Sequence, residues 1–144
     1  MFRSYIVGII CVLFALGNQA VFASNGYAEF DIAVYGDKDC SPASKKTPVI
    51  KMDANLKCNS YSYADSVKKI TTGSQGELRC YRDKVVMNKY PFSGTCDRKA
   101  KIIDKDHEVK AGECMPNPSH EGTVYEKLEN YKYPGNEDCR LKSK

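Results

Sequence analysis

Cysteine is the residue type that most constrains this chain. Cys11 lies in an apolar N-terminal stretch, and the other six cysteines are spread over the rest of the sequence: Cys40, Cys58, Cys80, Cys96, Cys114 and Cys139. An even number of cysteines in an oxidising compartment predicts three disulfides, whose pairing the count alone leaves open. The two closest, Cys80 and Cys96, are 16 positions apart, unlike the close pairs of a metal site. We expect a small disulfide-stabilised domain with no metal and no cofactor.

The first 23 residues have the parts of a secretory signal peptide. Arg3 supplies positive charge, an apolar run extends from Tyr5 to Leu16, and Val21 and Ala23 put small side chains before a cleavage point. The apolar run is short for a membrane span of about 20 residues, which favours cleavage near Ala23 over an anchor. We predict a signal peptide at 1–23 and one secreted, extracellular domain at 24–144, with no membrane contact after cleavage.

The cysteine spacing suggests an internal repeat. Cys40 to Cys58 and Cys96 to Cys114 both span 18 positions, and a third cysteine follows each pair, at Cys80 and Cys139. This pattern predicts two tandem three-cysteine modules at 27–80 and 81–139, with chance spacing as the alternative. Equivalent modules would pair Cys40 with Cys58 and Cys96 with Cys114, which leaves Cys80 to pair with Cys139.

Hydrophobic periodicity predicts mainly strands. Two sets of residues alternate from Tyr27 to Tyr35, with Ala28, Phe30, Ile32 and Val34 on one face, the clearest period of two in the chain. Weaker strand candidates are Val49–Met52, Leu78–Tyr81, Lys84–Lys89, Lys101–Ile103 and Val109. Two sets with helical spacing predict one short helix per module: Tyr63, Val67 and Ile70, and Val124, Leu128 and Tyr131. The predicted fold is α+β, predominantly antiparallel β with short helices, and the alternative is an all-β sandwich.

Two histidines are the candidates for acid–base chemistry. His107 lies in the polar run 104–108 (DKDHE), which we interpret as a solvated hairpin turn because aspartate favours turns. His120 is predicted to lie in a loop before the second helix. A hydrolase would need one of these histidines in a cleft with a glutamate or an arginine. No other catalytic motif accompanies them, so we predict no catalytic residues.

One short segment is similar to a known enzyme family. Residues 83–88 (DKVVMN) resemble a strand of the small secreted fungal ribonucleases of the T1 type, over six residues of the chain. In that family a catalytic histidine follows shortly after this strand. Residues 89–101 of this chain contain no histidine, so the family's chemistry is not carried over.

Charge and composition favour binding to another protein. Basic and acidic residues are interspersed along the chain, as on a solvated surface, so we expect no nucleic-acid partner. Residues 41–48 and 114–119 are candidate loops of a rigid binding surface. We predict a monomeric, cysteine-rich, non-enzymatic interaction module that acts as an effector, inhibitor or ligand on an extracellular or host protein. The alternatives are a small ribonuclease-like hydrolase and a matrix or wall component.

Overall fold

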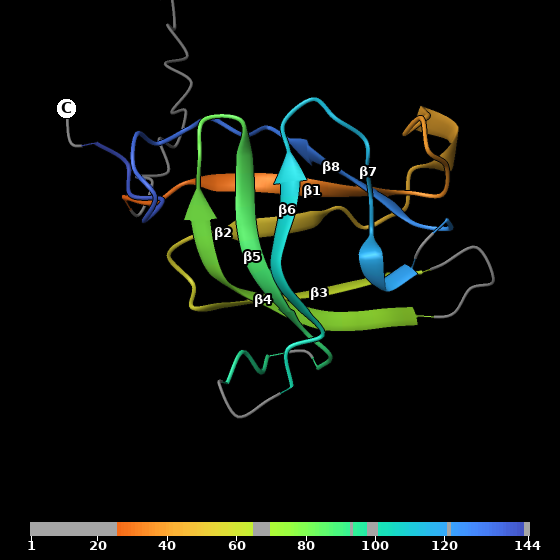
Figure 1. Cartoon of the computed structure of the whole chain (residues 1–144), viewed down its shortest axis with the longest axis horizontal. Coiled ribbons are helices and arrows are strands. Elements are labelled where there is room, and N and C mark those ends of the chain that lie inside the picture. The colour runs from red at the N-terminus through yellow and green to blue at the C-terminus, as the bar shows by residue number, and fades with distance from the viewer. Residues whose placement is uncertain (1–25, 65–69, 93, 98–100, 121, 143–144) are drawn as a thin grey trace, which may run out of the picture.

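The computed structural model describes residues 26–64, 70–92, 94–97, 101–120 and 122–142. In these residues two antiparallel four-stranded sheets pack face to face (Figure 1). The first sheet has the order β2-β1-β8-β7, with bounds Ile50–Asp53, Glu29–Tyr35, Tyr125–Glu129 and Met115–Pro116. The second sheet has the order β3-β4-β5-β6, with bounds Cys58–Ala64, Ile70–Cys80, Lys84–Tyr90 and Asp104–Lys110.

Two short 3-10 helices, Pro42–Ser44 and Pro118–His120, lie in connections between strands. None of the described helices is long and apolar enough to cross a membrane.

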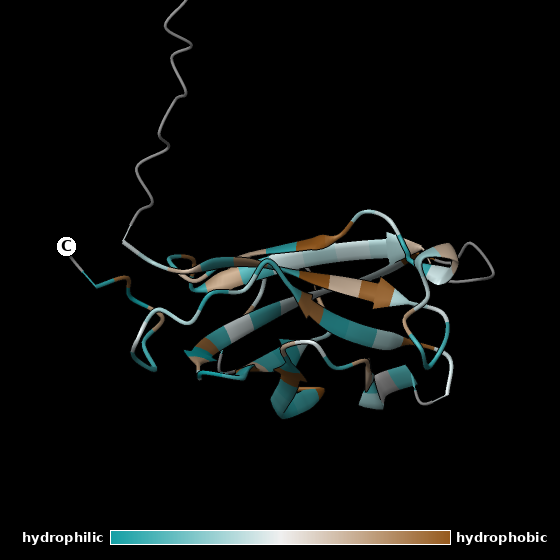
Figure 2. Ribbon diagram, turned by 90° about the horizontal axis from the view of Figure 1, so that it is seen from above, coloured by the Kyte–Doolittle hydropathy of each residue, from teal (hydrophilic) through white to brown (hydrophobic). Residues whose placement is uncertain are grey.

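The core lies between the sheets, because alternate side chains of each strand point toward the opposite sheet. Apolar and hydrophilic positions alternate along several of the strands (Figure 2). Buried residues from both sheets form one cluster: Ala28, Phe30, Ile32, Val34, Ile50, Met52, Tyr63, Cys80, Val85, Met87, Val109, Val124, Leu128 and Cys139. Burying a large apolar side chain contributes roughly 1.5–3 kcal/mol, so this cluster is the main stabilising element of the fold.

The fold is mostly antiparallel β, so the sandwich alternative describes it better than α+β. Both helix predictions are wrong: Tyr63 lies in β3, Ile70 begins β4, and β8 runs through Leu128. Val67 lies outside the described residues. In β8 the inward side chains are those of Glu126 and Leu128. Because one of the two is a glutamate, the apolar residues of this strand do not show a period of two.

The strand predictions fared better. β1, β2 and β5 lie within a residue or two of the strands predicted at 27–35, 49–52 and 84–89. The predicted strand 78–81 is the end of a longer β4. Residues 101–103 are not a strand, and the predicted turn at 104–108 is wrong because these residues form most of β6.

All six cysteines form disulfides, but only one predicted pair is correct. Cys80 pairs with Cys139 as expected, whereas Cys40 pairs with Cys114 and Cys58 pairs with Cys96. The predicted pairs within each module are wrong because β1 lies beside β8, not beside the next cysteine-bearing segment. Each half of the chain supplies two strands to each sheet, and the duplication itself stays a prediction.

Candidate functional site

A buried ion cluster joins the two sheets. Glu126 of β8 is almost fully buried, and its Oε1 accepts hydrogen bonds from Lys89 Nζ at 2.7 Å and from Asn117 Nδ2 at 3.0 Å. Its Oε2 accepts a hydrogen bond from His107 Nε2 at 2.5 Å. The other ring nitrogen of His107, Nδ1, lies 2.8 Å from Asp104 Oδ2. The cluster therefore links β8 of the first sheet to β5 and β6 of the second.

The partners of Glu126 keep it ionised. Burial alone would raise the pKa of a carboxyl group, because it disfavours the charged form. The positive charge of Lys89 and the hydrogen bond from His107 outweigh burial and lower the pKa of Glu126 to about 2. A charged carboxylate is therefore part of the folded protein at all physiological pH values.

The position of this cluster limits what it can do. The side chains of Lys89, His107 and Glu126 are 2%, 3% and 1% exposed, so a substrate in solvent cannot reach them. Every carboxylate oxygen of Glu126 already accepts a hydrogen bond. We therefore interpret the cluster as a clamp between sheets.

The second histidine, His120, does not belong to such a cluster. His120 ends the second 3-10 helix and is half-buried, and its Nδ1 has no hydrogen-bond partner among the described residues. Among the described residues, neither histidine lines the surface hollows at β1–β2, at the β2–β3 connection or at the β4 bulge. Within the described ranges, no group of three His, Cys, Asp or Glu side chains is placed to hold a metal ion.

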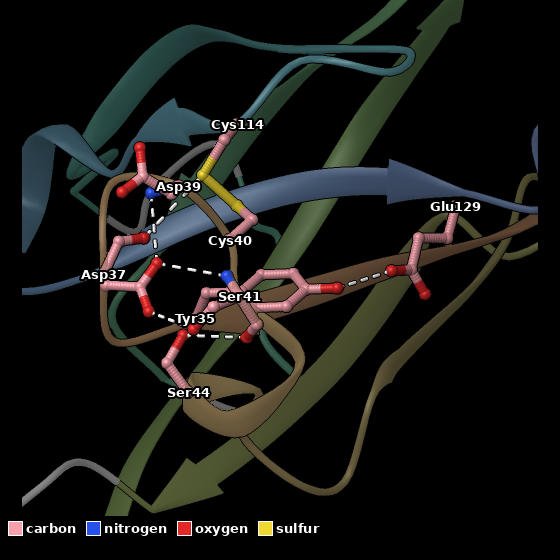
Figure 3. Close-up of a disulfide and its surroundings, with 8 residues drawn as sticks. All are labelled: Tyr35, Asp37, Asp39, Cys40, Ser41, Ser44, Cys114 and Glu129. Atoms are coloured by element: carbon pink, nitrogen blue, oxygen red, sulfur yellow. Dashed lines mark hydrogen bonds between the residues drawn. A yellow bond between two sulfur atoms is a disulfide. The ribbon is translucent and has the colours of Figure 1, made fainter.

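The structure brings the two candidate loops together at one end of the sandwich. The first loop, residues 36–46, follows β1, and the second, residues 112–120, leads toward β8, which pairs with β1 through Tyr35 and Tyr125. The Cys40–Cys114 disulfide joins them across 74 positions of sequence (Figure 3). The loops predicted from sequence were 41–48 and 114–119, so the disulfide starts from the residue just before the first predicted loop and ends at the first residue of the second.

Side chains within the first loop fix its shape. Asp37 Oδ1 accepts hydrogen bonds from the backbone N–H groups of Asp39 and Ser41, at 3.0 and 3.1 Å, and Asp37 Oδ2 accepts one from the Ser41 hydroxyl (Figure 3). These bonds to Ser41 lower the pKa of Asp37 to about 2. Such a turn holds the backbone around Cys40, a residue with a positive φ of 49°, in one conformation.

Strand β8 anchors both loops through two carboxylates. Glu129 accepts hydrogen bonds from Tyr35 Oη at 2.6 Å and from Lys45 Nζ at 2.8 Å, which ties the end of the first loop to β8. Glu126 holds the second loop through Asn117, whose backbone N–H also donates to Val124 O at 2.9 Å. Each loop is therefore fixed by the disulfide and by one glutamate of the same strand.

The tips of the two loops are open to solvent. Their exposed residues, which we name the loop-pair surface, are Lys38, Asp39, Pro42, Ala43, Gly112, Glu113, Pro116 and Pro118. The set contains residues of both signs of charge and three prolines. A rigid, mixed surface of this kind suits contact with another protein better than contact with a single small molecule.

Comparison with family models, with curated proteins and with solved structures found no match for this chain. The site therefore has to be argued from its own residues. Sequence analysis missed Lys89, Asn117, Glu126 and Glu129. One pattern in the sequence bears on them: Lys89 continues the inward positions of Val85 and Met87, and a charge in such a series indicates a buried partner.

Proposed function

We propose that this protein is a secreted, non-enzymatic interaction module that binds another protein through the loop-pair surface. The observation that carries the proposal is the Cys40–Cys114 disulfide between the two loops. Three disulfides are also consistent with an extracellular protein.

Rigidity is the property that makes this surface suitable for binding. Ordering a loop on binding costs about 0.5–1.5 kcal/mol for each side chain that is immobilised. Here the loops are already held by a disulfide, by the hydrogen bonds of Asp37 and by the anchors to Glu126 and Glu129. The conformational entropy of the loops is therefore lost when the protein folds, and little more of it is lost when a partner binds.

The buried state of His107 argues for binding over hydrolysis. A general base must come within hydrogen-bond reach of its substrate, and both ring nitrogens of His107 face buried or half-buried carboxylates instead. The ribonuclease-like alternative predicts turnover of RNA that is lost in His107→Ala or His120→Ala.

The test compares variants at opposite ends of the molecule. The oxidised protein would be used to isolate binding proteins from extracellular and host extracts, and each candidate would then be purified and its affinity measured. Lys38→Glu, Ala43→Arg and Glu113→Lys alter exposed loop residues. Lys57→Glu, in the β2–β3 connection at the other end of the long axis (Figure 1), is the matched charge control.

We expect saturable binding to a purified partner, weakened at least tenfold by the loop variants and unchanged by Lys57→Glu. Equal binding by all four variants would show that the loop pair is not the contact surface. Turnover of RNA without any saturable partner would support the hydrolase alternative and refute the proposal.

A further inference from the structure

Strand β3 is an unprotected edge of the second sheet. It pairs with β4 in seven successive residue pairs, from Cys58 opposite Gly76 to Ala64 opposite Ile70, with no shift in register. No strand of the described residues pairs with its other side. An edge strand presents backbone N–H and C=O groups that can pair with another chain.

The other three edges carry features that block such pairing. Five of the seven residues of β6 are charged, and Asp106 within it has a positive φ of 54° beside a register shift. β2 has only four residues and contains Lys51 and Asp53. β7 has two residues and ends at Pro116. Charges, bulges, short length and proline are the usual means by which proteins protect a sheet edge.

β3 has none of these features. Its sequence from Cys58 to Ala64 (CNSYSYA) contains no charged residue, no proline and no glycine. The exposed side chains on its outward face are small: Ser60, Ser62 and Ala64. On the inward face Tyr61 and Tyr63 stack with ring centroids 6.2 Å apart. The edge is therefore regular and uncharged. On its outward face Cys96 and Gly94 approach Cys58 and Ser60, whereas Ser62 and Ala64 are exposed.

Packing holds β3 in place against β4. The Tyr61 ring lies over Gly73, where a Cβ atom would come within 2.5 Å of the tyrosine hydroxyl. The Cys58–Cys96 disulfide fixes the start of the strand. A preformed strand loses little entropy when a further strand is added.

We propose that β3 pairs antiparallel with β3 of a second copy of this chain, about a two-fold axis at Tyr61. This register uses the full length of the strand and places Ser60 of one copy opposite Ser62 of the other. An uncharged strand meets an identical strand without repulsion between like charges, and β3 is uncharged. The result is one continuous eight-stranded sheet across an isologous interface.

The expected dimer is weak. One seven-residue strand buries less than the roughly 1,000 Å² that a stable interface needs, so association appears only at high protein concentration. The monomer expected from sequence is then the form at low concentration. This proposal uses a different strand from the loop-pair surface and does not depend on the proposed function.

Sedimentation equilibrium of the oxidised protein, from about 10 µM to about 1 mM, tests the proposal. Ser62→Lys puts a charge on the edge and should weaken association roughly tenfold, because the lysines of the two copies become diagonal neighbours across the axis and repel each other. Thr72→Lys is the matched control: Thr72 is exposed on β4 directly opposite Ser62, one strand inside the edge. It should associate as the parent protein does.

Ser60→Glu combined with Ser62→Lys should restore association, because the antiparallel register puts each lysine opposite a glutamate of the other copy. A parent protein that stays monomeric throughout the range would overturn the proposal. So would a Ser62→Lys variant that associates like the parent, or a double variant as weak as Ser62→Lys alone.

Discussion

Replacing Glu126 by glutamine tests the clamp between the sheets, because it exchanges one carboxylate oxygen for an uncharged amide group. The substitution keeps the shape of the side chain but removes the charge that Lys89 Nζ meets at 2.7 Å. It also puts an amide donor where three donors now converge, from Lys89, His107 and Asn117. Lys89 would then be a buried ammonium, 2% exposed, without a carboxylate partner.

The burial of the pair sets the magnitude. Breaking a buried ion pair by removing one partner costs about 3–5 kcal/mol, whereas an exposed pair contributes about 0–1 kcal/mol. We therefore expect Glu126→Gln to lower the free energy of unfolding by about 3–5 kcal/mol. Against a total of about 5–15 kcal/mol for a domain of this kind, that is a large share.

Strand β8 supplies its own control. Glu129→Gln makes the same exchange three residues away, where the side chains of the Lys45–Glu129 pair are 32% and 26% exposed. We expect that variant to lose no more than about 1 kcal/mol. Adding Lys89→Met to Glu126→Gln should recover much of the loss, because it removes the unpaired ammonium.

Urea unfolding with the disulfides intact gives these free energies. The chain has no tryptophan, so far-UV circular dichroism is the suitable probe. Equal, small losses for Glu126→Gln and Glu129→Gln would refute the buried cluster. No recovery in the double variant would show that the unpaired Lys89 is not the source of the loss.

Three further predictions concern pH, the loop disulfide and a glycine. Stability should fall as the pH drops from about 4.5 to about 2, because the unfolded state protonates Glu126 before the folded state, whose pKa is about 2, does. Replacing Cys40 and Cys114 together by serine should cost about 4 kcal/mol, since that bridge spans 74 positions. Gly73→Ala should cost about 1–3 kcal/mol, because its Cβ would come within 2.5 Å of the Tyr61 hydroxyl.

Each of these has a simple check. Urea unfolding at several pH values should show a smaller acid loss in Glu126→Gln than in the parent. Thermal unfolding of the double serine variant should give a lower midpoint, and an unchanged midpoint would contradict the role of the bridge. Gly36→Ala is the control for Gly73→Ala, because its Cβ would meet side-chain atoms at ordinary contact distances, Lys46 at 3.5 Å and Ser44 Cβ at 3.8 Å.

Strands whose inward residues are apolar could be predicted from the sequence. Strands β6 and β8, which each have a titratable inward residue, were instead predicted as a turn and a helix. In β1 the inward residues include Phe30, Ile32 and Val34, so their alternation is visible without knowing any partner. In β6 and β8 the inward residues include His107 and Glu126, whose burial depends on each other and on Lys89. A local pattern cannot contain that information, because the three residues meet only after the sheets pack.

Two of the three predicted disulfides were wrong for a related reason. Equal spacing favours local pairs, but the cysteines pair according to the order of strands in space. β8 lies beside β1, with Asp31 opposite Glu129, and this neighbourhood brings the segment before β8 to the loop after β1. The Cys80–Cys139 pair was predicted correctly only because it was the pair left over, so its agreement does not support the module argument.

The anchoring of both loops to β8 determines when the loop-pair surface forms during folding. Both carboxylate anchors, Glu126 and Glu129, lie on a strand that pairs with β1 almost 100 positions earlier in the chain. The loops can therefore take their final shape only after the last strand has docked, and long-range pairing of this kind is slow compared with local contacts. The disulfide then retains that shape when the loops fluctuate. Cys40→Ser with Cys114→Ser removes the covalent link between the loops but keeps both carboxylate anchors and the other two disulfides, so the double variant should weaken binding more than it changes the far-UV circular dichroism spectrum.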